Sequence, residues 1–461
     1  MIDRIAARRC NGNEATKGIA MTRSHPRRRK LTTAALAGAL TATLALTACA
    51  GGGDVAEDGV VTLQLWDTDT RPERTESLQE LISMFEAENP DIKIEYLGLP
   101  TDSYMQKIGT AIATNSTPDL VTPKASDLSG LVAQGALAPI DDLIEAGGWE
   151  EQLDPGLVDS TRKAVPDGAL YMTPATAIAD TIYYRADWLA DAGLGVPENW
   201  DEFDAAAAAL TDQSSGQFGY TIRGGNGFFP QFMQMVYTRA GIAEIFDESG
   251  KATLDDPAVI EAAQKYVDLY KTTTAESDLT ADFKVMIAQF TGGGAGMLSH
   301  SIGSYPTMLQ TLEPEQIAVN TPYEADNGVE VIGRLTTGFA MFEQSEKKEA
   351  ASKFLEFTMG QEGNSFWAEA SGYIPGNTAV FEDQWVQDNP AISAAIASSQ
   401  NPDAVSMNVP YYLPEWTSIT GTDMLPDWQR VLQGQMTVTE FCTKWADSLT
   451  EANERYQELT S

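Results

Sequence analysis

Residues 168–194, GALYMTPATAIADTIYYRADWLADAGL, constrain the fold most strongly, because they have the pattern of a chain passing from one lobe to another. Two apolar runs with strand composition, 169–172 and 182–184, flank a segment of Pro, Ala and Thr. Pro174 fixes its own backbone and disfavours helix at Thr173, so the segment between the runs stays extended. We therefore predict two strands here and a crossover between two lobes.

The chain before this crossover alternates strand and helix patterns. Residues 61–66 (VTLQLW) are typical of a buried strand, 92–97 alternate like a second strand, and 118–122 are predicted to form a third. Between them, apolar residues recur at helical spacing: Leu78, Leu81, Ile82 and Phe85, then Met105, Ile108 and Ile112. This β-α-β-α-β order predicts the beginning of a doubly wound lobe.

A second lobe is predicted after the crossover. Residues 186–192 are expected to form a short helix closed by Gly193, and 218–223 a strand that ends in a glycine-rich turn. The chain is expected to cross back near 331–339 and a third time at GYIPGN, 372–377. Apolar stripes in the last fifty residues predict C-terminal helices that cap the structure.

The crossover also carries a resemblance. The run PATAIADTIYYRADWLADAGL, followed by VPENWDEF, resembles the signature of the family 1 extracellular solute-binding proteins, the ligand receptors of bacterial ABC importers. Thr181 and Arg185 depart from the family pattern. The positions that fit are Pro174, Ala175, Thr176, Tyr184, Leu189, Asp191, Leu194, Pro197 and 200–203.

The resemblance covers the chain from Val61 to the last helix and implies an α/β fold with two lobes, of the type II periplasmic-binding-protein kind. Each lobe would hold a doubly wound sheet, and the ligand cleft would lie between the lobes. We expect the N-lobe to comprise residues 58–177 and 336–375, and the C-lobe 178–335 and 376–461.

The first fifty residues have the pattern of a secretion signal. A basic segment at 27–30 precedes a short apolar run, and Leu46-Thr47-Ala48-Cys49 resembles a bacterial lipoprotein processing site. We expect 1–48 to be a signal peptide, Cys49 to be lipidated, and 49–57 to be a tether. Residues 1–20 lack signal character, which favours Met21 as the true start.

Charge and composition exclude several classes of function. Without residues 1–48, the chain keeps 21 of its 30 Lys and Arg residues and 64 of its 66 Asp and Glu residues, so the formal net charge changes from −36 to −43. Nucleic acid or an anionic membrane surface would require clustered cations. Beyond Cys49 the chain has one cysteine, Cys442, and one histidine, His300. We therefore expect no disulfide, no metal site and no cofactor.

Polar candidates for the ligand site lie near strand ends, where open α/β sheets bind ligands. The acids are Asp67, Asp69, Asp127 and Asp180, whose carboxylates are suited to sugar hydroxyls. Each also has a structural alternative: a solvated loop acid, a helix N-terminal acid at Asp127, or an ion pair of Asp180 with Arg185 or Arg334. The cations are Arg71, Arg223 and Arg334, which either bind an anionic group or pair with acids.

Aromatic candidates follow from the shape of a sugar, which has an apolar face of C–H groups and a rim of hydroxyls. The resemblance implies ligand contacts for Tyr305 and Trp416. Trp66 lies at the carboxyl end of the first predicted strand and Tyr373 in a predicted loop, and both are expected to face the cleft. The alternative for each aromatic residue is a place in the core.

The resemblance implies a receptor, not an enzyme, that captures a mono- or oligosaccharide and delivers it to an ABC permease. It would be a monomer, lipid-anchored to the outer face of the cytoplasmic membrane. Two alternatives use the same fold: a receptor for glycerol phosphate or another polar solute, and a ferric receptor using Tyr183-Tyr184 or Tyr411-Tyr412. A third is an exported carbohydrate-active enzyme using two of the four acids.

Overall fold

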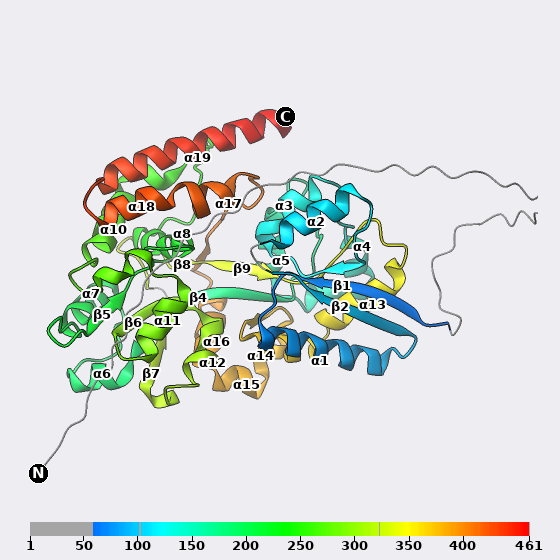
Figure 1. The fold of residues 1–461 in the computed structure, drawn as a ribbon, viewed down its shortest axis with the longest axis horizontal. Helices are drawn as coiled ribbons and strands as arrows, with labels where there is room; N and C mark the ends of the chain where they lie inside the picture. The colour runs from blue at the N-terminus through cyan, green and yellow to red at the C-terminus, as the bar shows by residue number, and fades with distance from the viewer. Residues whose placement is uncertain (1–58, 101–102, 322, 461) are drawn as a thin grey trace, which may run out of the picture. The chain divides into compact units, whose positions relative to one another are not determined.

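The computed structural model describes residues 59–100, 103–321 and 323–460, so the predicted signal peptide, Cys49 and the whole predicted tether lie outside the described residues. Two main sheets with helices on both faces organise the described chain (Figure 1). None of the helices described is both long and apolar enough to cross a membrane.

The first sheet has the strand order β10-β3-β1-β2. Its strands are β1 (Val61–Asp67), β2 (Ile92–Gly98), β3 (Leu120–Val121) and β10 (Ala340–Met341). β1 pairs in parallel with β2 and β3, and β10 is antiparallel to β3. The predicted order of the first three strands is confirmed. β3 is shorter than the predicted 118–122, because Pro118 and Pro123 cannot donate ladder hydrogen bonds.

Helices cover both faces of the first sheet. Leu63 and Leu65 of β1 pack with α1, α4, α13 and α14, while Val121 of β3 packs with α2 and α3. The helices around this sheet are α1 (Pro72–Glu88), α2 (Tyr104–Ala113), α3 (Ala125–Val132), α4 (Asp141–Gly147), α5 (Pro155–Lys163), α13 (Lys348–Met359) and α14 (Gln361–Ser371).

The second sheet is built around a single long strand, β4 (Thr176–Arg185), which pairs antiparallel with four others. Ile182 and Tyr184 face one hydrophobic core and Tyr183 the other, as the two-residue period of a strand requires. The other strands are β5 (Phe218–Thr221), β6 (Ala295–Ser301), β7 (Ile317–Asn320), β9 (Arg334–Thr337) and β11 (Ile374–Pro375), and a separate pair joins β8 (Val331–Ile332) to β12 (Val405–Ser406).

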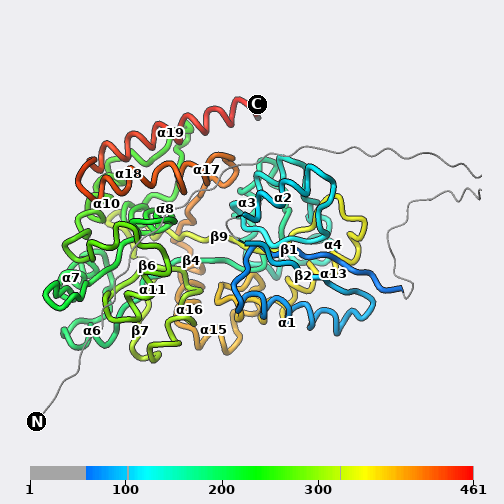
Figure 2. The backbone as a smooth tube through the Cα atoms, in the orientation of Figure 1, coloured from blue at the N-terminus to red at the C-terminus, as the bar shows by residue number. Residues whose placement is uncertain are grey.

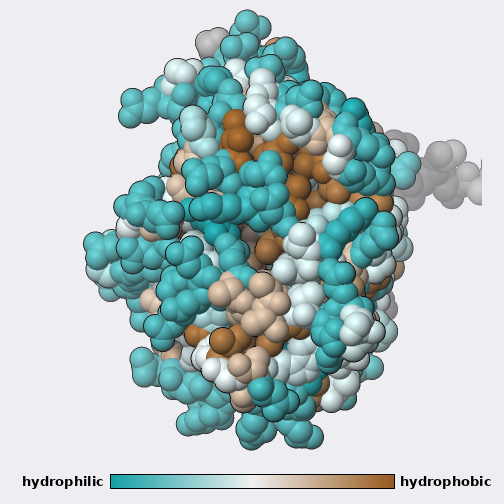
Figure 3. Space-filling model, turned by 90° about the vertical axis from the view of Figure 1, so that its left-hand side faces the viewer, coloured by the Kyte–Doolittle hydropathy of each residue, from teal (hydrophilic) through white to brown (hydrophobic). Residues whose placement is uncertain are grey.

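Helices also enclose the second sheet. They are α6 (Ala186–Asp191), α7 (Trp200–Ala209), α8 (Phe228–Phe232), α9 (Thr238–Ala240), α10 (Pro257–Asp268), α11 (Phe283–Thr291), α12 (Tyr305–Met308), α15 (Gln384–Asp388), α16 (Pro390–Gln400), α17 (Trp416–Ser418), α18 (Leu425–Leu432) and α19 (Val438–Thr460). Hydrophilic residues predominate on the face in Figure 3, with hydrophobic residues gathered in smaller areas between them. This face is therefore mostly suited to contact with water.

The chain passes between the sheets through β4 and returns through β9, and these strands lie side by side (Figure 2). Thr176 pairs with Thr337, and their hydroxyl oxygens are 2.7 Å apart. The lobe boundaries predicted after residues 177, 335 and 375 fall within β4, within β9 and at the end of β11. The boundaries themselves stay a prediction.

The strand predicted at 169–172 is wrong. The backbone groups of Leu170 form no strand-to-strand hydrogen bonds. Its N–H donates to the Asp141 carboxylate at 2.9 Å, and its carbonyl accepts from the Ile140 N–H at 2.7 Å. Only the second apolar run lies in a strand, and that strand already begins at Thr176.

Candidate functional site

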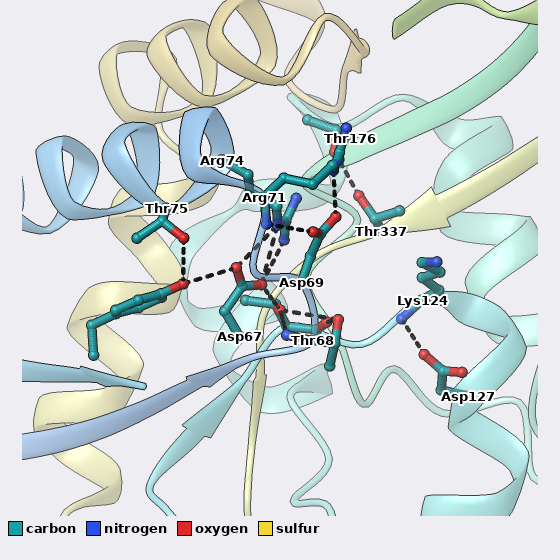
Figure 4. A network of polar contacts seen from close by, with 12 residues as sticks. Asp67, Thr68, Asp69, Arg71, Arg74, Thr75, Lys124, Asp127, Thr176 and Thr337 are labelled. Atoms are coloured by element: carbon teal, nitrogen blue, oxygen red, sulfur yellow. Dashed lines mark hydrogen bonds and ion pairs between the residues drawn. The ribbon is translucent and has the colours of Figure 1, made fainter. Parts of the chain in front are cut away.

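A small cavity lies where the carboxyl ends of β1 and β3 meet the crossing strands β4 and β9. Its volume is about 100 Å³. It is lined by Thr68, Asp69, Arg71, Arg74, Thr122, Pro123, Lys124, Ile178, Thr337, Gly338, Trp367 and Tyr373. Figure 4 shows how the polar side chains after β1 lie relative to Thr176 and Thr337 of the crossing strands. Three predicted site residues therefore line one cavity: Asp69, Arg71 and Tyr373.

Asp69 and Arg71 form an ion pair at the edge of this cavity. Arg71 Nε donates to Asp69 Oδ2 at 2.9 Å, and the Arg71 backbone N–H donates to Asp69 Oδ1 at 3.0 Å. Burial opposes ionisation of Asp69, but these contacts outweigh it and lower the pKa of its carboxyl group. Burial also opposes the charge on Arg71, while Asp69 and Tyr373 raise its pKa above the ordinary value. Both groups are therefore charged at neutral pH and available for hydrogen bonds to a polar solute.

Asp67 has a structural role instead of the ligand contact predicted for it. Its side chain is fully buried, and Arg74 on the first turns of α1 binds it through Nε and Nη2 at 2.9–3.2 Å. Thr122 also donates its hydroxyl to Asp67 Oδ1 at 2.6 Å, which ties the end of β3 to β1. These partners and the burial leave Asp67 no face toward a solute.

Trp66 points away from the cavity, as expected for the residue that alternates with Asp67 along a strand. Its ring lies under Lys107 of α2, with Nζ 4.8 Å from the ring centroid, and it packs against the core between β3 and α3. We therefore assign Trp66 to packing on α2 and not to the site.

Asp127 is a helix cap, the structural alternative considered for it. Its Oδ2 accepts the backbone N–H of Lys124 at 3.0 Å (Figure 4). Its Oδ1 accepts the Tyr104 hydroxyl at 2.7 Å. A carboxylate in the first turn of a helix is favoured by the helix dipole. The structure brings Lys124, and not Asp127, to the cavity wall.

Asp180 lies on β4, the central strand of the second sheet, and Arg223 lies in the loop after β5, at the end of that sheet. The Asp180 side chain points to the same face of β4 as that of the cavity-lining Ile178, because residues two apart on a strand share a face. Burial raises the pKa of Asp180, and the nearby charge of Arg223 offsets this increase only in part. Burial also lowers the pKa of Arg223. Arg223 donates to Met286 Sδ at 3.4 Å and to the Gly227 carbonyl at 3.2 Å, and forms no ion pair with any residue that the structure describes. These two groups keep hydrogen-bonding capacity toward the space beside β4.

His300 adjoins this pair on β6, where it is opposite Thr181 of β4. Burial, with Arg223 nearby, lowers the pKa of His300 to about 3, so the ring is neutral under ordinary conditions. Its Nδ1 is 2.7 Å from the Ser304 hydroxyl, while Nε2 is buried without a hydrogen-bond partner among the described residues.

The other three aromatic candidates have different surroundings. Tyr373 lines the cavity and lies against Gly303, where an added Cβ would be 2.6 Å from its ring. Tyr305 is only 6% exposed and packs in the core beneath α11 and α16. Trp416 is 5% exposed and makes an edge-to-face contact with Phe229, with ring centroids 5.8 Å apart. Stacking requires an exposed face, so we assign Tyr305 and Trp416 to the core.

Arg334 belongs to the opposite side of the crossing strands. It forms an ion pair with Asp154 at 3.3 Å, in which both side chains are 8% exposed. Arg334 and Thr336 alternate with the cavity-lining Thr337 along β9, and they border another cavity of about 390 Å³. The ion-pair alternative therefore describes Arg334.

Comparison with known protein families agrees with this geometry. A family model for bacterial extracellular solute-binding proteins matches residues 80–394. The chain belongs to this family.

Relatives of this solute-binding protein are similar over most of their length. The Escherichia coli protein YcjN is 26% identical over 72% of this chain and 77% of its own. The mannitol-binding protein of Pseudomonas aeruginosa is 26% identical over 78% of this chain and 86% of its own. The solved ABC substrate-binding protein Lmo0181 of Listeria monocytogenes, in complex with cycloalternan, has a TM-score of 0.72 at 20% identity, covering 85% and 98% of the two chains. The fold is accordingly two-lobed and of the periplasmic-binding type.

Sequence reasoning missed several side chains of the solute-binding protein's cavity. Lys124, Thr122 and Thr337 follow or form short strands that carry little periodic signal, and Trp367 comes from α14, far along the chain. Arg74 could have been suspected as a partner of Asp67, because a cation in the first turn of a helix is unfavourable unless an acid lies beside it.

Proposed function

We propose that this solute-binding protein captures a carbohydrate outside the cytoplasm and delivers it to an ABC importer without altering it. The observation that carries the proposal is the cavity at the strand ends, where an ion pair, threonine hydroxyls and Tyr373 converge beside the crossing strands. Charged and hydroxyl groups with an aromatic ring suit a polyhydroxylated solute. The relatives named for mannitol and cycloalternan support the same class of ligand.

The proposal assigns Asp69, Arg71 and Tyr373 to one lobe's half of the site, and Asp180 and Arg223 to the other half. A solute that contacts both halves stabilises the closed arrangement through its higher affinity for that arrangement. The closed form would then be presented to the permease. We also propose that the protein acts as a monomer held at the membrane through Cys49.

Glycerol phosphate is the second candidate ligand, since Arg71 and Lys124 both line the cavity and are suited to a phosphate group. The Asp69 carboxylate lies in the same cavity and disfavours a second anion there. A neutral carbohydrate is therefore the better match.

A thermal-shift screen with purified protein tests the proposal, because a solute that binds only the folded state raises the melting temperature. The probes are maltose, raffinose, mannitol and glycerol 3-phosphate. We expect at least one carbohydrate to raise the melting temperature and to be recovered unchanged. A response to glycerol phosphate alone, or turnover of the sugar, would contradict the proposal.

Asp69→Ala should weaken binding of the responding carbohydrate roughly ten- to hundredfold, the effect of losing one charge-assisted hydrogen bond. Asp255→Ala is the matched control, because Asp255 is 22% exposed in an ion pair with Lys251, as Asp69 is with Arg71. Calorimetry on both variants makes the comparison, and equal affinities for the two would remove Asp69 from the site.

A further inference from the structure

Phe283 is an aromatic residue at the edge of the second sheet with an exposed ring. It is the first residue of α11, and its side chain is 43% exposed, in contrast to Tyr305 and Trp416. The Asp282 carboxylate caps α11 by accepting the N–H groups of Lys284 and Val285 at 3.0 Å. The position of the ring is therefore fixed by the start of a capped helix.

The start of α11 is tied to the loop that carries Arg223. Gly224 and Gly225 donate their N–H groups to the carbonyls of Asp278 and Ala281, each at 3.0 Å. An added Cβ at either glycine would lie 2.4–2.6 Å from backbone atoms, so the two segments are in direct contact. Phe283 thus lies beside the carboxyl end of β5, where the ligand-facing edge of a parallel strand pair is found.

A buried polar group without a hydrogen-bond partner among the described residues lies beside the Phe283 ring. Its centroid is 6.2 Å from that of His300, whose Nε2 is buried and unpaired among the described residues. Met286, one helical turn along α11, contacts the Arg223 guanidinium. No hydrogen bond or ion pair in the described chain involves the Asp180 carboxylate, although it lies near Arg223. A buried polar atom without a partner is costly unless a ligand satisfies it, so the space beside the exposed Phe283 ring is suited to a polar solute.

We propose that Phe283 is the stacking platform of the second lobe and that the ligand is a cyclic sugar, which deepens the proposed function and rests on it. The C–H face of a sugar ring would lie on Phe283, and its hydroxyls would bridge Asp180 and Arg223. An open-chain alditol has similar hydroxyls but no rigid apolar face, so it should bind less tightly. Under this proposal the protein prefers a cyclic sugar, whereas its mannitol-binding relative is named for an open-chain alditol.

Matched pairs of ring and reduced forms test the ligand class: glucose with sorbitol, and maltose with maltitol. We expect the wild-type protein to bind at least one ring form more tightly than its alditol, measured by calorimetry. If an alditol binds as tightly as its ring form, this inference is overturned while the carbohydrate function stands. If neither these sugars nor the carbohydrates of the screen bind, both proposals are overturned.

Variants of Phe283 test the residue itself with the sugar that binds. Phe283→Leu keeps an apolar side chain without a flat ring, and we expect it to weaken binding roughly tenfold. Phe283→Tyr should retain the wild-type affinity. Val285→Ala is the control, because Val285 is also 43% exposed on α11 but lies two residues away around the helix. Unchanged affinity in Phe283→Leu, or an equal loss in Val285→Ala, would overturn the role of Phe283.

Discussion

Asp67 and Asp69 lie two residues apart, yet the fold gives them opposite roles. The end of β1 directs the fully buried Asp67 to Arg74, whose side chain is 14% exposed. Asp69 follows the strand end and pairs with Arg71, whose side chain is 52% exposed. When one partner of a buried ion pair is removed, the remaining charge has no water to solvate it. When one partner of a surface pair is removed, water solvates the remaining charge. The two pairs should therefore differ greatly in their contribution to stability.

Arg74→Met should lower the free energy of unfolding by roughly 3–5 kcal/mol, because it leaves the buried Asp67 charge uncompensated. Arg71→Met should lower it by less than about 1 kcal/mol, because the ion pair of Arg71 is partly solvated. Urea unfolding of the ligand-free variants measures both values. Similar losses for the two substitutions would mean that Asp67 is not the buried charge described.

At the level of elements, the crossing segments approach each other so closely that two positions exclude a side chain. A Cβ at Gly338, between β9 and β10, would lie 1.7 Å from the Thr173 carbonyl oxygen. A Cβ at Gly376, just after β11, would lie 1.9 Å from the Pro174 carbonyl oxygen. Glycine at both positions lets the returning segments pack on the segment that enters β4.

Gly338→Ala should therefore destabilise the fold by roughly 1–3 kcal/mol or more, since the backbone must shift to relieve the overlap. Gly109→Ala is the matched control: an added Cβ on α2 meets no atom within 4 Å, and we expect a gain of about 0.5–1 kcal/mol from the higher helix propensity of alanine. Melting temperatures of the two variants should move in opposite directions. A neutral Gly338→Ala would show that the crossing segments pack more loosely than described.

Across the whole molecule, sequence periodicity predicts which segments are strands and helices better than it predicts which side chains reach the site. Alternation along 92–97 corresponds to β2, and the apolar spacing at Leu78 and Phe85 corresponds to α1. By contrast, Trp416 is buried by Phe229, a contact between segments far apart in the chain that no local pattern contains. Similarly, the pairing of Asp67 with Arg74 depends on how α1 packs against β1.

The attachment of the whole molecule to a membrane is proposed to depend on Cys49. The chain has a formal net charge of −36, so anionic lipid headgroups repel the protein and give it no electrostatic affinity for the membrane. A lipidated terminal cysteine with its acyl chains would hold the protein stably, as a single chain does not. Cys49→Ala should therefore move the protein from the membrane fraction to the soluble fraction, while Cys442→Ala, which alters a buried thiol, should leave it with the membrane. Cell fractionation followed by immunoblotting makes the comparison, and quantitative retention of Cys49→Ala with membranes would show that another segment provides the attachment.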